Sequence, residues 1–135
     1  MTGKILLAMP PERQIRVLNI LESEHYDVTL AADAARATML LGFPAHFDLV
    51  LVDADIPGGS WREILQMVIA SRPECEVIVC SRCGEEELWA DVIQSGAFDL
   101  IPDPIERNEL LRIVNSARNS EYLRRFTHFH NAQAS

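Results

Sequence analysis

Short runs of branched apolar residues alternate along this chain with segments of helical periodicity. The apolar runs lie at residues 4–8, 27–31, 48–53, 76–80 and 97–101. Runs that are apolar at successive positions are typical of strands buried on both faces of a sheet. Between them, apolar residues recur every three or four positions, as they do on one face of a helix. Because a helix connects each strand to the next, we expect parallel strands with right-handed crossovers.

This order of elements predicts a flavodoxin-like, doubly wound (βα)5 α/β fold. Five parallel strands with helices on both faces most commonly take the order 2-1-3-4-5. The length of 135 residues suits one domain with a proper core. We expect this domain to span residues 1–119, and residues 120–135 to extend the last helix or to form a linker or tail. The sequence does not indicate whether another domain follows residue 135.

Local signals predict where the helices begin and which side chains they bury. Asp33 and Ser60 are suitable N-caps for the second and third helices. In the first helix Ile15, Leu18 and Leu21 fall on one apolar face, which we expect to contact the sheet. In the fourth helix Trp89 is in phase with its apolar neighbours, so we expect it to face the core rather than a partner.

Composition excludes several classes of protein. The net charge of −8 argues against a nucleic-acid surface, because phosphate binding requires clustered Lys and Arg. No apolar run is long enough to span a membrane, and the chain begins without the pattern of a signal peptide, so we expect a cytoplasmic protein. Three cysteines, an odd number, do not form a disulfide framework.

One polar residue ends the most apolar strand of the chain. Residues 49–52 are all branched and apolar, and Asp53 follows them directly. A Pro-Gly-Gly turn comes shortly afterwards, at residues 57–59. The carboxyl ends of parallel strands border the crevice where open α/β sheets bind ligands. A carboxylate is costly there unless it is paired, so Asp53 indicates a site. The alternative is an Asp that caps the following turn.

At this point the chain resembles the receiver domains of two-component response regulators over roughly residues 4–118. The matching segments are residues 48–53 with 56–58, 77–81 and 95–101. The resemblance implies that Asp53 is at the position of the phosphoacceptor aspartate. It also implies that Ser81 is at the position of the hydroxyl that contacts the phosphoryl group.

The chain departs from the family pattern at the residues that support phosphoryl transfer. The acidic pair of the family is replaced by Met9 and Pro10, and its Lys is replaced by Asp103. The switch aromatic of the fifth strand is replaced by Leu100. A carboxylate that accepts a phosphoryl group needs a divalent cation, and Mg²⁺ needs oxygen ligands. We therefore expect no cofactor, since Mg²⁺ loses its acidic ligands and Asp103 would repel an incoming phosphoryl group.

Two acids near the predicted site are candidates to replace the missing ligands. Asp55 lies two residues after Asp53, and Glu12 follows the two prolines of the first loop. Either side chain would have to turn into the crevice to serve as a metal ligand. The alternative is that both are solvated surface acids.

These departures favour a signalling module that is not an enzyme and works without phosphorylation. Its partners would be proteins, namely a histidine kinase or an output domain, and neither nucleic acid nor a membrane. The resemblance implies a face formed by the fourth helix, fifth strand and fifth helix, which would also serve a homodimer. The alternative is a working response regulator in which Asp53 accepts a phosphoryl group with unconventional ligands.

The cysteines and histidines suggest two further hypotheses. Cys80 and Cys83 form a Cys-x-x-Cys motif where the fourth strand ends, which is typical of a redox site. Against this, Cys80 falls within the apolar alternation of its strand. Metal binding by these cysteines would require His128 and His130 of the tail to reach them. A flavin or dinucleotide site is disfavoured, because no glycine-rich loop follows the first strand.

Overall fold

The structure is a computed structural model that describes residues 3–43, 46–82 and 85–134, with the side chains of those up to residue 120. Its strands are β1 (Lys4–Ala8), β2 (Asp27–Ala31), β3 (Leu49–Asp53), β4 (Glu76–Ser81) and β5 (Asp99–Pro102). Its helices are α1 (Pro11–Ser23), α2 (Ala34–Gly42), α3 (Trp61–Ser71), α4 (Glu86–Gln94) and α5 (Arg107–Ala134). These ten elements are the strand–helix units predicted from the sequence.

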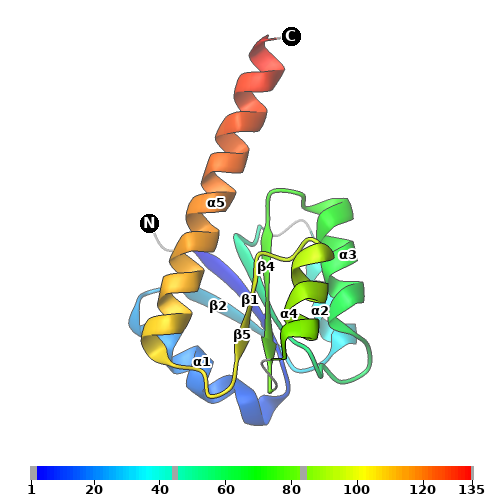
Figure 1. Cartoon of the computed structure of the whole chain (residues 1–135), viewed down its shortest axis with the longest axis vertical. Coiled ribbons are helices and arrows are strands. Elements are labelled where there is room, and N and C mark those ends of the chain that lie inside the picture. The colour runs from blue at the N-terminus through cyan, green and yellow to red at the C-terminus, as the bar shows by residue number, and fades with distance from the viewer. Residues whose placement is uncertain (1–2, 44–45, 83–84, 135) are drawn as a thin grey trace.

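The five strands form one parallel sheet in the order β2-β1-β3-β4-β5. Helices α1 and α5 cover one face of the sheet, and α2, α3 and α4 cover the other (Figure 1). The predicted flavodoxin-like fold and strand order are therefore confirmed. Because β1 and β3 are neighbours while their connections leave toward opposite faces, a crevice opens at their carboxyl ends.

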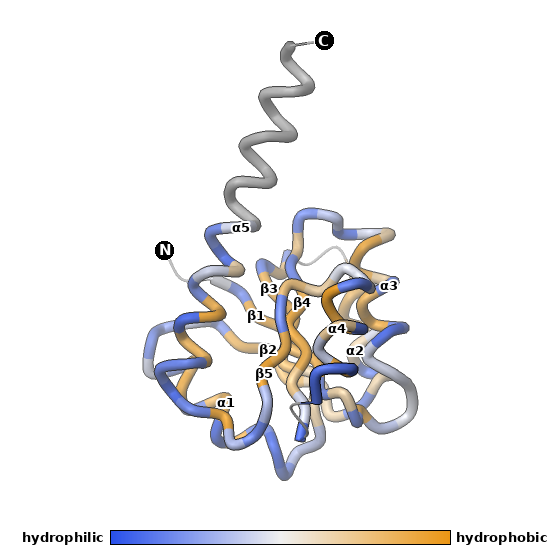
Figure 2. Tube along the Cα trace, viewed as in Figure 1, coloured by the Kyte–Doolittle hydropathy of each residue, from blue (hydrophilic) through white to orange (hydrophobic). Residues whose placement is uncertain are grey.

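Alternating strand residues enter two separate hydrophobic clusters. Leu6 and Val50 face the helices α2, α3 and α4, whereas Leu7 and Leu51 face α1 and α5. All four side chains are fully buried, which explains why these strands are apolar at every position. The apolar segments accordingly converge on the sheet, and hydrophilic residues occupy the outer turns of the helices (Figure 2).

The helix starts follow the local signals of the sequence. Asp33 accepts a hydrogen bond from the backbone N–H of Arg36, and Ser60 accepts one from that of Glu63. Both caps are therefore confirmed. Pro11 occupies the first turn of α1, where its missing N–H removes no intrahelical bond.

Two predictions about buried helix faces are wrong. Of the face predicted for α1, Leu21 is buried and Leu18 packs partly buried against the core, but Ile15 is 62% exposed, and Val17 and Ile20 are buried as well. Trp89 is 50% exposed, and its indole N–H donates to Asp99 of β5 at 3.3 Å. In α1 and in α4, the apolar residues occupy a wider sector of the helix than the side that contacts the sheet. Some apolar side chains are therefore exposed to solvent.

Helix α5 is much longer than the other helices. It begins beside the carboxyl ends of the strands and extends past the opposite edge of the sheet (Figure 1). Four apolar residues of its first part are buried against the sheet, namely Leu110, Ile113, Val114 and Ala117. The helix continues without a break to Ala134. A boundary of the domain at residue 119 remains a prediction.

Candidate functional site

Three polar residues meet at the carboxyl edge of the sheet. Asp53 ends β3, Ser81 ends β4, and Asp103 follows β5 directly. Asp53 is completely buried, Ser81 is 4% exposed, and the Asp103 side chain is 34% exposed. The backbone carbonyl of Ser81 accepts a hydrogen bond from the Asp103 N–H at 2.8 Å. The predicted site residues are therefore assembled, with two carboxylates among them.

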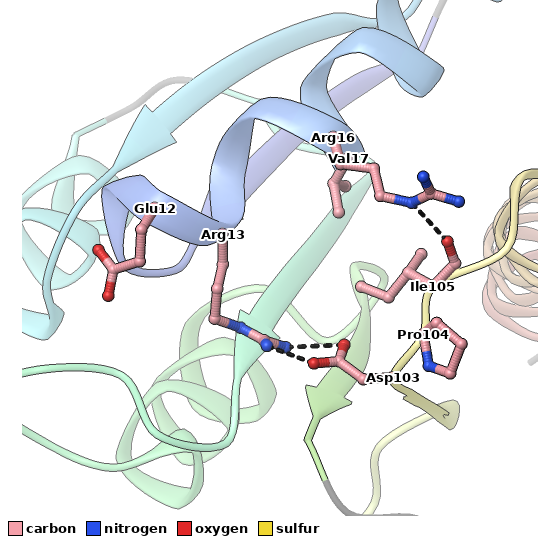
Figure 3. A pocket seen from close by; sticks show the side chains of 7 residues that line it. All are labelled: Glu12, Arg13, Arg16, Val17, Asp103, Pro104 and Ile105. Carbon is pink, nitrogen blue, oxygen red and sulfur yellow. Dashed lines mark hydrogen bonds and ion pairs between the residues drawn. The ribbon is translucent and has the colours of Figure 1, made fainter.

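A residue that the sequence analysis did not identify lies between these carboxylates. Arg13, from the first turn of α1, donates from Nε to Oδ2 of Asp53. Its Nη1 donates to Oδ2 of Asp103 at 2.5 Å, and its Nη2 donates to Oδ1 of the same residue at 3.1 Å. Figure 3 shows the guanidinium pointing at Asp103 across the gap between α1 and the loop that follows β5. One guanidinium thus bridges both acids at the same time.

The start of α1 explains why Arg13 points into the crevice. Pro10 has the extended backbone angles φ −56° and ψ 146°, and its carbonyl accepts the Arg13 N–H at 2.9 Å. The Met9 side chain is fully buried in the cluster that faces α1 and α5. The two prolines therefore begin the helix directly above the end of β1, and its first turn faces β3 and β5.

The charges of this cluster favour a permanently ionised Arg13. The hydrogen bonds that Arg13 donates to Asp103, and also to Asp53, raise the pKa of Arg13 above its ordinary value, whereas burial acts in the opposite direction. Only 13% of the Arg13 side chain is exposed. Two carboxylates and one guanidinium leave a formal charge of −1. Bidentate contact with a carboxylate is a geometry that a planar guanidinium provides and an ammonium does not.

The residues of the crevice do not fit the magnesium site that the receiver pattern implies. Met9 and Pro10 provide no carboxylate, and the Met9 side chain is turned into the core. Both oxygens of Asp53 accept hydrogen bonds, one from Arg13 and one from the Asp55 N–H at 2.8 Å. Within the described part of the chain, no three His, Cys, Asp or Glu residues are grouped so that they could hold a metal ion.

The two acids considered as substitutes lie at the rim of the crevice. Asp55 and Glu12 are both exposed. Figure 3 shows the Glu12 carboxylate pointing away from Arg13 and Asp103. Asp55 approaches Asp53 through its backbone N–H. This arrangement favours the interpretation of both residues as surface acids.

A cavity of about 530 Å³ opens beside Arg13, between α1 and the loop after β5. Arg16, one turn further along α1, borders it and donates from Nε to the carbonyl of Ile105 at 2.7 Å. Arg13 and Arg16 therefore join the same helix to the same loop, but only Arg13 contacts carboxylates (Figure 3). Leu100, at the position of the switch aromatic, is buried on the face of the sheet that α2, α3 and α4 cover, which is the face away from α1 and Arg13.

The geometry argues against the redox and metal hypotheses. Cys80 is fully buried, and this burial, together with the charge of Asp53, raises the pKa of its thiol to about 12. Its thiolate is therefore scarce at neutral pH. Cys83 lies outside the described residues. The backbone of residues 128–130 belongs to the end of α5, which is far from the carboxyl edge where Cys80 lies (Figure 1).

The doubly wound sheet with a buried aspartate at the end of β3 defines a receiver-type module, and sequence comparison agrees. The model of the response regulator receiver domain matches residues 11–115. The chain therefore belongs to the response regulator receiver domain family. Within the described residues, no helix combines the length and apolar character that are needed to cross a membrane.

Individual relatives and solved structures are similar to this chain over most of its length. The chemotaxis protein CheY of Listeria monocytogenes is 26% identical over 101 residues, which cover 75% of this chain and 85% of CheY. The transcriptional regulator NtrC of Rhizobium meliloti is 29% identical over 87% of this chain, which spans 24% of NtrC.

Among solved structures, NtrX of Brucella abortus superposes with a TM-score of 0.83 at 26% identity, over 95% of this chain and 29% of NtrX. A CheY-like receiver domain of Methanospirillum hungatei has a TM-score of 0.81 at 22% identity, over 92% of this chain and 99% of that domain. The second likeness concerns the fold alone.

Proposed function

We propose that this chain is a receiver-type signalling module that acts through protein contacts and does not use Asp53 as a phosphoryl switch. The observation that supports this proposal is the Arg13 guanidinium, which binds Asp53 and Asp103 together. A module of this kind transmits a signal through its choice of binding partner, and it catalyses no reaction.

The electrostatics of the crevice support the proposal. Attack on a phosphoryl donor requires a carboxylate oxygen of Asp53 that is free to approach phosphorus, but both oxygens accept hydrogen bonds. The transferred group would also add negative charge to a cluster that is already formally −1. Among the described residues, no cation besides Arg13 forms an ion pair with Asp53 or Asp103, so nothing offsets this charge in the way that a metal ion would. The Asp103 carboxylate, in place of an ammonium, opposes it further.

The proposed partners are a histidine kinase or an output domain. Supporting this, Trp89 on α4 is half exposed and is held against β5 by its bond to Asp99. A fixed, exposed aromatic side chain is a common anchor of protein interfaces. The face formed by α4, β5 and α5 is accordingly the proposed contact surface, either for a partner or for a second copy of the chain.

The deciding experiment is incubation with acetyl phosphate and Mg²⁺, followed by intact-mass spectrometry. We expect no phosphoryl adduct on the wild-type chain, and no response of its tryptophan fluorescence to beryllofluoride. Asp53→Asn is the matched control, because it keeps the side-chain shape while removing the acceptor. An adduct that forms on the wild-type chain and disappears in Asp53→Asn would show a working switch and would overturn the proposal.

The alternative function keeps Asp53 as the phosphoacceptor with unconventional ligands. One observation favours this alternative. The Arg13 guanidinium binds Asp103 through two nitrogens, and guanidinium groups bind phosphoryl oxygens in the same bidentate manner. Arg13 would then have to exchange Asp103 for the phosphoryl group. An Asp53-dependent adduct that forms equally well in the presence of EDTA is the result that this alternative requires.

A further inference from the structure

Charge is divided unevenly along the last third of the chain. Residues 85–106 contain seven acidic residues and no Lys or Arg, whereas residues 107–134 contain five arginines and two glutamates. The first segment forms α4 and β5, and the second forms α5. An acidic surface and a basic helix attract one another, provided that their charges are not already paired inside the domain.

The acidic end of α4 faces solvent. Glu85, Glu86 and Glu87 are exposed, and none of them forms an ion pair within the described part of the chain. Trp89 follows Glu85 and Glu86 by about one helical turn, so these three residues lie on the same side of α4. The Trp89 side chain is 50% exposed and is bonded to Asp99 of β5. This side of α4, here called the Trp89 side, therefore presents an apolar anchor with an acidic rim.

The arginines of α5 differ in where they lie along the helix. Arg107 pairs with Glu24 at 3.0 Å, close to the end of α1. Arg112 pairs with Glu109 of its own helix at 2.8 Å. Two further arginines, at positions 124 and 125, belong to the second half of α5, residues 121–134, which projects away from the sheet (Figure 1). The positive charge of this second half lies outside the body of the domain.

The sequence gives the second half of α5 an aromatic stripe that does not continue the packed side of the helix. Ala117 is buried against the sheet, and the same side of the helix continues through positions 121 and 124, which are Glu and Arg. Aromatic residues recur at i, i+4 and i+7 on another side, namely Tyr122, Phe126 and Phe129. A stripe of this kind requires a surface other than the sheet of its own domain.

We propose that the second half of α5 from one copy of this chain docks on the Trp89 side of α4 of a second copy, and that the contact is reciprocal. The inference rests on the proposed function and deepens it, because it names the occupant of the contact surface. Basic and aromatic residues then meet an acidic rim and a fixed indole. Two identical contacts about one two-fold axis close the assembly as a dimer.

The lengths of the two elements are compatible with this contact. At 1.5 Å per residue, residues 121–134 span about 21 Å, and the nine residues of α4 span about 14 Å. The second half of α5 is therefore long enough to cover α4 from end to end.

Charge favours α4 as the occupied surface over pairing of two α5 helices with each other. Residues 121–134 contain two arginines and two histidines against one glutamate, so two such segments repel one another. The net charge of −8 also opposes association of two whole chains, but at physiological ionic strength this repulsion is screened beyond about 8 Å. The local charges at the contact therefore decide which surfaces meet.

The experiment is sedimentation velocity of the full chain at increasing protein concentration, compared with charge-reversed variants. The α4 variant is Glu85→Arg with Glu86→Arg, and the α5 variant is Arg124→Glu with Arg125→Glu. We expect the wild-type chain to approach a dimer and each variant alone to remain a monomer, because each variant places like charges in both contacts. An equimolar mixture of the two variants should dimerise again, since both contacts then join opposite charges.

Glu22→Arg with Asp27→Arg is the matched control. It changes the net charge as much as the α4 variant does, on exposed residues of α1 and β2, and β2 is the edge of the sheet opposite to β5. This control should dimerise like the wild-type chain. Trp89→Ala should raise the Kd of the dimer by about tenfold or more, as expected for an anchor residue.

A wild-type chain that stays monomeric at every concentration would overturn the inference. An α4 variant that dimerises as well as the wild-type chain would also overturn it, because the α5 helices would then pair with each other. Either reversal alone reports the contact, so loss of folding in one variant leaves the other as the test. In all these cases the proposed function stands, because it depends on phosphoryl uptake by Asp53. An adduct on Asp53 would overturn the proposed function and leave the sedimentation result unchanged.

Discussion

Asp53 has no contact with solvent, and its charge is balanced by a side chain that is itself only 13% exposed. Removing one partner of a buried ion pair leaves an uncompensated charge, which is far more costly than losing a pair on the surface. At the scale of single residues, the stability of the site therefore depends on Arg13.

We expect Arg13→Ala to lower the free energy of unfolding by about 3 kcal/mol in buffer without divalent cations, since Asp53 loses its counter-charge. Urea unfolding followed by circular dichroism measures this change. Arg62→Ala is the control, because Arg62 pairs with Asp91 where both side chains are well exposed, and its loss should cost less than about 1 kcal/mol. Equal effects of the two substitutions would contradict this account of Asp53.

The thiol of Cys80 is expected to be inert in the folded protein. In a Cys83→Ser background, Ellman's reagent at pH 8 should react with neither Cys75 nor Cys80, because both are buried and the pKa of Cys80 is raised to about 12. Both should react on unfolding in urea. Rapid reaction of a native thiol would restore the redox hypothesis.

The raised pKa of Cys80 also predicts that the folded protein loses stability at alkaline pH. Because burial raises its pKa in the folded state, the stabilisation by neutral Cys80 is complete below the ordinary thiol pKa. It is lost as the pH rises toward about 12, where the folded thiol ionises. Urea midpoints of the wild-type chain should therefore fall more steeply with rising pH than those of Cys80→Ala.

At the scale of elements, the start of α2 is fixed against the loop that follows β3. The Ala34 N–H donates to the Pro57 carbonyl at 2.9 Å, and a Cβ added at Gly59 would lie 2.6 Å from the Cβ of Ala34. This separation is too small for two carbon atoms without a shift of the backbone. Gly59 thus allows the loop beside the site to pack directly on the helix.

Gly59→Ala is therefore expected to destabilise the protein by about 1–3 kcal/mol through overpacking. Gly42→Ala is the matched control, since an added Cβ meets nothing within 4 Å there and helix propensity favours Ala. Thermal unfolding of both variants gives the comparison. A Gly59→Ala variant as stable as Gly42→Ala would show that the loop can move away from α2 at no cost.

The elements themselves were predictable because their signals are local. Apolar runs, N-caps and prolines act within a few residues, and they predicted the ten elements and both caps. Exposure of Ile15 and Trp89 was not predictable in the same way, because it depends on how far each helix rotates against the sheet.

The site was predictable in part for the same reason. Asp53 was identified by its place at a strand end, whereas Arg13 was missed because its partners are 40 and 90 residues away in sequence. One signal was available, since a buried Asp53 and a nearby Asp103 together require a cation. Several arginines could have supplied it, and only the fold selects Arg13.

At the scale of the whole molecule, the sheet and the first part of α5 form the core, and the rest of α5 extends beyond it (Figure 1). We expect a chain that ends at residue 120 to keep its thermal midpoint within a few degrees, because the described buried residues of α5 precede this point. A chain that ends at residue 109 should not fold, since it lacks Leu110, Ile113 and Val114. Thermal unfolding by circular dichroism compares the two truncations.

The bridge made by Arg13 has a consequence for engineering a phosphorylatable protein from this one. Asp103→Lys alone would place an ammonium group beside the Arg13 guanidinium, so a substitution that copies the common receiver pattern would create like-charge repulsion. The order of changes therefore matters. Arg13 has to be replaced first, then Asp103, and only then does adding carboxylates at positions 9 and 10 provide ligands to an open crevice.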